Sequence, residues 1–263
     1  MRRARVTFVH IAMEGGTRLE GLALNPGDGL LYTARRDTLM LLGLDPQGRV
    51  VVRNDLASAG VTRPRGMVFA PSGDLTDDPA ALSLYVLDDP DGARTHGHLV
   101  EVSLAQVQAP VAAATATSTS ALVHTIDSSL WSPPSPDPSG IAYDATRNRL
   151  LVSDGEVEEM TIWRGANYFE SSLSGALLAT SDLTSFTIEP VGVAWVPSGL
   201  RTIFSDDDAR KVFVVTLGAD GRPGTADDAV TSFSTTAFNS GDPEGVTLDP
   251  GQNRLFIADG VNA

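Results

Sequence analysis

The chain contains no cysteine, only one lysine and no long apolar run, and these absences narrow what it can be. Without cysteine, neither a disulfide framework nor a thiolate metal site can form. No segment approaches the roughly 18 consecutive apolar residues of a membrane-spanning helix, so no membrane span is expected. The short apolar stretch Val6–Met13 follows several arginines but lacks a small-residue cleavage site. We interpret it as a strand rather than a signal peptide, and the localisation stays unknown.

Positive charge is also scarce. Nineteen basic residues stand against thirty-three acidic ones, which gives a formal net charge of −14. Such a surface repels nucleic acids and anionic membranes and attracts cations. Nucleic-acid binding needs a basic footprint that this sequence does not offer. The charge therefore excludes nucleic acid as a partner, although simple solubility accounts for it equally well.

A short pattern occurs five times along the 263 residues. Each copy has a glycine, an alternating apolar strand, a turn rich in Pro, Gly, Asn or Asp, a second apolar strand and an acidic residue. The copies are Leu19–Asp37, Pro64–Asp89, Pro138–Asp154, Pro190–Asp206 and Pro243–Asp259. Self-similarity at a period of tens of residues is typical of propeller folds. We expect one all-β domain, a β-propeller spanning residues 1–263.

The repeats also predict the blades. The spacing of their glycines equals or exceeds the ~40–45 residues of a four-stranded WD40-type blade, which indicates extended loops. In the third blade we expect a third strand at Met160–Trp163 and a helical turn within Asn167–Ser172. The last repeat lacks outer strands, and we expect Val6–Ile11 to complete it, because one terminus commonly closes a propeller ring. Five blades is the simplest count, and a fragment of a six-bladed parent is the alternative.

Strand order predicts where the acids gather. In a four-stranded blade, the segment before the first strand and the segment after the second strand lie at the same end. Because the first strand is innermost, these segments converge at the mouth of the central channel. The leading residue, directly before each repeat glycine, is in turn Glu20, Arg65, Ser139, Val191 and Glu244. In each repeat, acidic residues follow the second strand, so a ring of acidic residues is expected at the mouth.

Crowded carboxylates repel one another unless they are protonated or neutralised. A hard divalent cation would neutralise them, and Ca²⁺, which takes six to eight oxygen ligands, suits this donor set. The expected metal ligands are Glu20, Glu244, Asp89, Asp154, Asp206 and Asp259. The alternative for each strand-end aspartate is a turn cap that accepts backbone N–H groups. The two leading glutamates have no such turn role.

A second acidic loop, Gly218–Asp228, lies between the third and fourth strands of its blade and hence at the opposite end. Its Asp220, Asp227 and Asp228 are candidates for a second, structural Ca²⁺ site. Their spacing does not match the EF-hand series. A polar hairpin without metal is the alternative.

The loop between Asp88 and His98 provides candidate catalytic groups. A histidine has an unperturbed pKa near 6.5, so His96 or His98 beside a metal-bound water would serve as general base. A His-x-His pair also suits a transition metal. The alternative is a long exposed loop with incidental histidines. Arg36 and Arg65, expected at the same mouth, would orient an anionic substrate.

The repeats resemble a six-bladed propeller superfamily that includes NHL-repeat proteins, gluconolactonase-like enzymes of the senescence marker protein 30 type, and esterase-like phytase domains. The residues that carry the resemblance are Glu20-Gly21, Glu244-Gly245, Ser153-Asp154, Ser205-Asp206 and Ala258-Asp259. The chain also looks like bacterial surface or secreted propellers, which implies a location outside a bacterial cell.

In the gluconolactonase-like enzymes a leading Glu and strand-end Asp or Asn residues hold a catalytic divalent metal. The resemblance places Glu20 or Glu244 in the first role, and Asp154, Asp206 or Asp259 in the second. The sequence departs from that pattern because Arg65, Ser139 and Val191 stand at the other leading positions. It also has no clear counterpart of the Asn ligand and is one blade short.

Two functions follow as expectations. The first is a metal-dependent hydrolase that acts on a small anionic or ester substrate, namely a lactone, ester or phosphoester, at the acidic mouth. The second is a non-catalytic, Ca²⁺-stabilised binding propeller outside the cell, because fold alone does not decide function.

Overall fold

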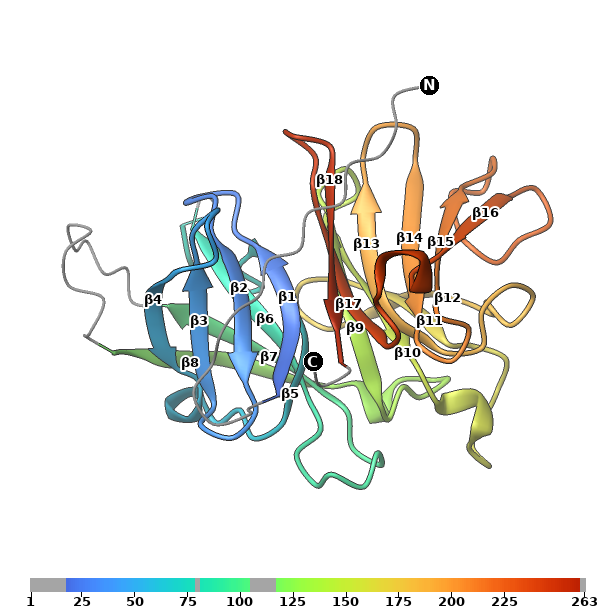
Figure 1. Ribbon diagram of the computed structural model, residues 1–263. Helices are drawn as coiled ribbons and strands as arrows, with labels where there is room; N and C mark the ends of the chain where they lie inside the picture. Colours follow the sequence, from blue (N-terminus) through green and yellow to red (C-terminus); the bar gives the residue numbers. More distant parts are fainter. Residues whose placement is uncertain (1–17, 79–80, 105–116, 261–263) are drawn as a thin grey trace.

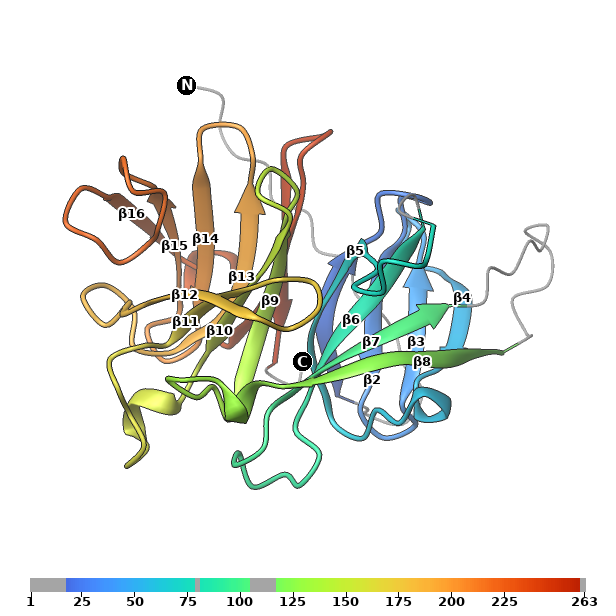
Figure 2. The same cartoon turned by 180° about the vertical axis from the view of Figure 1, so that it is seen from behind.

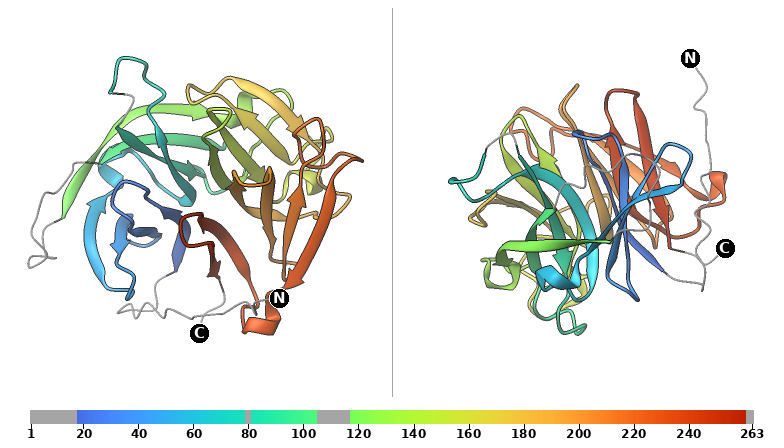
Figure 3. Two further views of the ribbon diagram at one scale, coloured as in Figure 1. Left: turned by 90° about the horizontal axis from the view of Figure 1, so that it is seen from above. Right: turned by 90° about the vertical axis from the view of Figure 1, so that its left-hand side faces the viewer.

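The computed structural model describes residues 18–78, 81–104 and 117–260, whose strands are arranged around a central axis (Figure 1, Figure 3). The predicted strand Val6–Ile11 lies outside these residues. Within the described part, no helix has both the length and the apolar character needed to cross a membrane. The all-β propeller expected from the repeats is confirmed.

Four blades each contain four antiparallel strands, and a two-stranded hairpin follows them. Blade one consists of β1 (Leu19–Leu24), β2 (Leu31–Arg35), β3 (Met40–Leu44) and β4 (Val50–Asp55). Blade two consists of β5 (Pro64–Pro71), β6 (Leu82–Asp88), β7 (His98–Leu104) and β8 (Ser118–Asp127). Blade three consists of β9 (Pro138–Asp144), β10 (Arg149–Asp154), β11 (Tyr168–Ser171) and β12 (Leu177–Ser181). Blade four consists of β13 (Pro190–Val196), β14 (Arg201–Asp206), β15 (Lys211–Thr216) and β16 (Ala229–Ser234). The final hairpin is β17 (Pro243–Asp249) and β18 (Arg254–Asp259).

Short 3₁₀ turns connect some of these strands: η1 (Ala57–Ala59), η2 (Ser128–Leu130), η3 (Val157–Glu159) and η4 (Thr236–Phe238).

The first strands of the five repeats form a ring. β1, β5, β9, β13 and β17 contact one another in that order, and β17 contacts β1 (Figure 3, left). A parallel pairing of β4 with β8 joins blades one and two into one eight-stranded sheet, seen from behind in Figure 2. In the described residues the fifth unit has only β17 and β18. A count of five complete blades therefore stays a prediction.

Apolar side chains from facing blades form the core. The clusters lie between successive units. Tyr32 of blade one contacts Phe69 of blade two with ring centroids 5.0 Å apart, and Tyr168 of blade three contacts Phe204 of blade four at 5.8 Å. The smallest of these clusters joins blade four to the final hairpin through Val246. The described residues form no cluster of this kind between the hairpin and blade one.

The repeat glycines allow the inner strands to approach closely. A methyl group added at Gly140 would lie 2.7 Å from the Cα atom of Gly192 and 2.5 Å from Ser153 Oγ. No side chain fits at that distance, so glycine is required for the contact between β9 and β13.

The third blade differs from the sequence prediction. The prediction of a strand at Met160–Trp163 is wrong, because those residues follow η3 in a loop. The prediction of a helical turn within Asn167–Ser172 is also wrong, because that segment contains the strand β11. The pattern Tyr-Phe-Glu-Ser of β11 does not alternate, yet all four residues are buried. Glu170 is buried there because Arg149 and Arg147 pair with its carboxylate.

Candidate functional site

The five leading residues line one cavity at the mouth of the ring. Its volume is about 220 Å³, and its walls include Glu20, Arg65, Ser139, Val191 and Glu244. The convergence expected from strand order is therefore observed. We call this space the mouth cavity.

Below the mouth cavity the channel is almost filled. Apolar side chains of the inner strands and the repeat glycines leave a space of only about 10 Å³, lined by Leu22, Met67, Ile141, Val193 and Val246 with Gly66, Gly140, Gly192 and Gly245. A small molecule therefore reaches the cavity only from the mouth.

One side of the mouth cavity carries arginines in ion pairs with carboxylates. Arg36 Nη1 lies 3.2 Å from Glu20 Oε1. Arg18 Nε lies 3.1 Å from the same oxygen, and its Nη2 donates to Glu244 Oε1 at 2.7 Å. Glu20 is almost fully buried and has two positive neighbours. Its charge is therefore already balanced in this structure.

Arg65 and Arg94 belong to the same side and share Asp137. Arg65 Nη2 lies 3.8 Å from Asp89 Oδ2 and 3.8 Å from Asp137 Oδ1, too far for a hydrogen bond in either case. Arg94 Nε lies 3.5 Å from Asp137 Oδ2, and Arg94 also pairs with Glu156. Arg65 Nε and Asp137 Oδ1 are buried without a hydrogen-bond partner among the described residues. Both residues line the cavity, and these two shielded atoms keep a hydrogen-bonding capacity that the described protein groups do not satisfy.

Burial raises the pKa of the Asp137 carboxyl, even though Arg65 and Arg94 oppose the shift. The side chain of Asp137 is only 4% exposed. It precedes Pro138 in the approach to β9, and Asp154 holds its backbone N–H at 3.0 Å.

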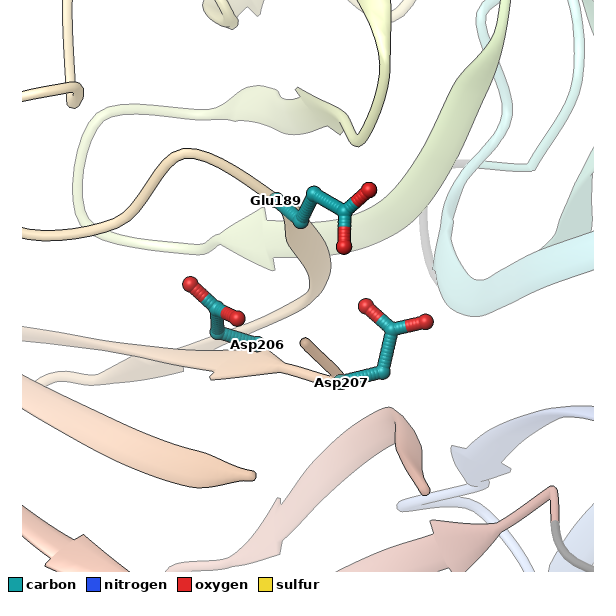
Figure 4. Close-up of side chains that lie close together, drawn as sticks. All are labelled: Glu189, Asp206 and Asp207. Carbon is teal, nitrogen blue, oxygen red and sulfur yellow. The ribbon is translucent and has the colours of Figure 1, made fainter. Parts of the chain in front are cut away.

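A second group of carboxylates, in and beside the wall of the mouth cavity, has few cationic partners. We call Glu189, Asp206, Asp207, Asp242 and Glu244 the acidic arc. Carboxylate oxygens of Glu189, Asp206 and Asp207 lie within 4.8 Å of one another, and so do those of Asp207, Asp242 and Glu244. In Figure 4 the carboxyl groups of Glu189 and Asp207 lie toward the right of the view, whereas that of Asp206 lies on the left and is turned away from Asp207. Within the described part of the chain, only Glu244 of the arc has an arginine partner.

The electrostatics of the arc follow from this crowding. Burial, with the neighbouring charge of Asp207, raises the pKa of Glu189 to about 8. The pKa values of Asp207 and Glu244 are also raised, first by burial and then by adjacent carboxylates. Asp207 Oδ1 is buried and has no hydrogen-bond partner among the described residues. The arc therefore holds excess negative charge that protons or a cation would neutralise.

The strand-end aspartates that the sequence singles out mostly fix turns. Both oxygens of the fully buried Asp154 accept hydrogen bonds, from Ser135 Oγ at 2.7 Å and from the Asp137 and Val157 N–H groups at 3.0 Å. Asp206 accepts from Thr187 Oγ1 at 2.6 Å and from the Ala209 N–H at 2.7 Å. Asp154 does not line the mouth cavity, whereas Asp206 joins the arc. Their roles as metal ligands stay predictions.

The two remaining candidate ligands, Asp89 and Asp259, do not line the mouth cavity. Asp89 is buried, lies at ion-pair distance from Arg65 and accepts the Arg94 N–H at 3.4 Å. Asp259, at the end of β18, accepts the N–H of Asp242 at 3.1 Å.

The predicted catalytic residues divide into two groups. Arg36 and Arg65 line the mouth cavity, whereas His96 and His98 do not. The His96 side chain is 61% exposed, and its Nδ1 lies 2.7 Å from Asp91 Oδ2, a contact that raises the pKa of His96. His98 begins β7, where its backbone stands opposite Asp88 of β6 and Asp127 of β8 in the sheet. Their catalytic role stays untested.

The second acidic loop binds its own backbone. Asp227 Oδ2 accepts the Ala219 N–H at 2.6 Å, and Asp228 Oδ1 accepts the Gly218 N–H at 3.0 Å. Asp220 Oδ1 accepts the Arg222 N–H at 3.0 Å. These bonds form a closed polar hairpin, as the alternative interpretation expects, and a structural metal there stays a prediction.

Sequence reasoning missed Asp137, Glu189 and Asp242. All three directly precede the first proline of a repeat, at Pro138, Pro190 and Pro243. A residue before proline is restricted to extended backbone. In this topology that position leads into the innermost strand at the mouth, so the acid-Pro pairs were the available signal.

Comparison with known proteins gives the fold. No protein-family profile and no curated protein sequence matches the chain. A solved nidogen/laminin complex aligns with 95% of this chain and 74% of its own at 14% identity and a TM-score of 0.52. A luciferin-regenerating enzyme aligns with 92% of this chain and 69% of its own at 12% identity and a TM-score of 0.52. A gluconolactonase from Xanthomonas campestris aligns with 93% of this chain and 84% of its own at 16% identity and a TM-score of 0.51. At these identities the likeness establishes the fold: the chain is a β-propeller of the kind seen in gluconolactonase-like and related propeller proteins.

Proposed function

We propose that this protein is a metal-dependent hydrolase that acts on a lactone, ester or phosphoester at the mouth cavity. The observation that carries the proposal is the arc of carboxylates with almost no cationic partners, beside a cavity that arginines also line and that is closed below. A hydrolase with a small, polar substrate needs such a combination of a charged anchor, anion-binding groups and limited water access.

The residues present suit a divalent cation. The mouth cavity is lined by four arginines (Arg18, Arg36, Arg65, Arg94) and six carboxylates (Glu20, Asp137, Glu156, Glu189, Asp207, Glu244). With every carboxyl group ionised, the lining has two negative charges in excess, which one divalent ion balances. The donors in the acidic arc are carboxylate oxygens, which Ca²⁺ prefers over the nitrogen and sulfur donors that softer metals favour.

Asp207 and Glu189, with Glu244 beside them, are the residues that would hold the ion. Asp207 belongs to both carboxylate groups of the arc, and its Oδ1 has no other partner among the described residues. When bound, a divalent cation polarises a carbonyl or phosphoryl oxygen and lowers the pKa of water.

The protein's own groups supply the remaining chemistry. Arg65 and Arg36, which line the cavity, attract the anionic part of the substrate. Asp137, which lines the cavity, accepts the proton of the attacking water, since its raised pKa makes it a better base than an ordinary aspartate. Water adds across the acyl–oxygen or phosphorus–oxygen bond, and the departing alcohol oxygen takes up a proton. For a lactone the product is the open hydroxy acid.

The test compares Asp207→Asn with Asp208→Asn. Asp208 is the adjacent, exposed aspartate and lies outside the two carboxylate groups. Metal content of the purified protein and turnover of an aryl ester, a lactone and an aryl phosphate are measured before and after chelation. We expect bound Ca²⁺, turnover that is lost with the metal, and a loss of metal affinity of at least about tenfold in Asp207→Asn alone. Undiminished turnover in the metal-free protein would overturn the proposal.

One observation favours the alternative, a non-catalytic Ca²⁺-stabilised binding propeller. Arg18, Arg36 and Arg94 are already in ion pairs, and the histidines expected to move protons lie outside the cavity. Under this alternative Ca²⁺ raises the melting temperature while no substrate of the panel is turned over.

A further inference from the structure

One guanidinium joins the first and last inner strands of the ring. Arg18 directly precedes β1, and it contacts Glu20 of β1 at 3.1 Å and Glu244 of β17 at 2.7 Å. Arg18 and Glu244 are 226 residues apart in the chain. Their contact spans the boundary between β17 and β1, which we call the closing boundary.

The closing boundary is packed less tightly than the others. A methyl group added at Gly245 would find its nearest neighbour at 3.5 Å, in β1, whereas the equivalent group at Gly140 would lie 2.7 Å from Gly192 Cα. The described residues place no apolar cluster at this boundary. None of the β18 side chains is fully buried. A polar contact therefore has more influence on closure here than elsewhere in the ring.

Glu244 belongs to two arrangements at once. It is the partner of Arg18 at the closing boundary, and it lies with Asp207 and Asp242 in the acidic arc. A cation drawn to the arc approaches the positive charge of Arg18, and the two cations repel each other at short distance. The single negative charge of Glu244 cannot fully neutralise both.

We propose that Arg18 is an internal counter-ion that clasps β17 to β1 through Glu244 and is displaced when a divalent cation occupies the acidic arc. The clasp is argued from the ion pairs and the packing. The displacement rests on the proposed function. Arg18 thereby lowers the affinity of the arc for metal and stabilises closure of the metal-free ring.

The experiment compares Arg18→Gln with Arg36→Gln. Both variants remove one positive charge beside Glu20, but Arg36 has no ion pair with Glu244. Amide exchange of β17 and β18 is measured in chelator, and Ca²⁺ affinity is measured by calorimetry. Arg18→Lys, which keeps the charge but not the forked donor geometry, serves as the conservative variant.

We expect exchange in β17 and β18 to accelerate at least about threefold in Arg18→Gln and to stay unchanged in Arg36→Gln. Ca²⁺ affinity should rise about threefold to tenfold in Arg18→Gln and less in Arg36→Gln, with Arg18→Lys near the native protein. Unchanged exchange in Arg18→Gln would overturn the clasp, and equal affinity in the two glutamine variants would overturn the displacement. If the native protein binds no Ca²⁺, the proposed function and the displacement both fail, while the exchange result still decides the clasp.

Discussion

Asp154 positions Asp137. The Asp154 Oδ2 atom at the end of β10 accepts the backbone N–H of Asp137 at 3.0 Å, and the Asp137 carboxylate lines the mouth cavity. A strand-end aspartate therefore fixes the residue that we propose as the base, in addition to closing its own turn.

Replacing Asp137 tests the proposed proton acceptor. In Asp137→Asn the turnover number should fall about 10²- to 10⁴-fold while KM changes little, because an amide cannot take the proton. Asp91→Asn, on the exposed loop of the same mouth, is the control and should retain turnover. Steady-state kinetics measure both, and near-native turnover in Asp137→Asn would exclude it as the base.

The metal-free protein should lose stability as the pH rises. Burial raises the pKa of Asp154 and of Glu158 to about 7 and that of Glu189 to about 8, well above the values of an unfolded chain. Between about pH 5 and 8 the native state thus binds more protons than the unfolded state, so stability falls with pH. In chelator we expect the melting temperature to drop by more than about 3 °C across this window. Saturating Ca²⁺ should reduce the slope by the part that Glu189 contributes, and a profile that rises with pH in chelator would contradict the assignment.

The glycines of the ring should differ in their tolerance of a methyl group. Gly140→Ala forces contacts of 2.5 Å and 2.7 Å with Ser153 Oγ and Gly192 Cα, and we expect a loss of about 2–4 kcal/mol in unfolding free energy. Gly245→Ala, at the equivalent position, meets only ordinary contacts of 3.5 Å and longer, and should lose less than about 1 kcal/mol. Denaturant unfolding compares the two variants. Equal losses would show that the closing boundary is as tight as the others.

Removal of the buried carboxylate of β11 should lower the free energy of unfolding. Glu170 is fully buried and pairs with Arg149 and Arg147. Glu170→Ala leaves two partly buried guanidinium groups without it, and we expect a loss of about 3 kcal/mol. Glu159→Ala, at an exposed position, should stay within about 0.5 kcal/mol of the native protein. Thermal and denaturant unfolding provide the measurement.

The same buried pair explains why the third blade was misjudged. Glu170 interrupts the apolar pattern of β11, and its burial becomes acceptable only because Arg147 and Arg149 reach it from β10 and the turn before it. A hydrophobicity pattern treats every glutamate as a polar residue, because it contains no information about a partner that neutralises the charge in the folded structure. The segment Met160–Trp163, which contains no charged residue, looked more like a strand for that reason.

The sequence by itself determined the propeller and the convergence at its mouth. Both follow from local patterns, because each repeat carries its own strands and turns and the strand order brings the leading residues together. Only the tertiary structure decided which acids are neutralised. Arg18 reaches Glu244 across 226 residues of sequence, and Arg94 of one blade reaches Asp137 at the start of the next, whereas Glu189 and Asp207 have no such partner among the described residues. Ion pairs depend on the reach of side chains between blades, and no local pattern specifies that reach.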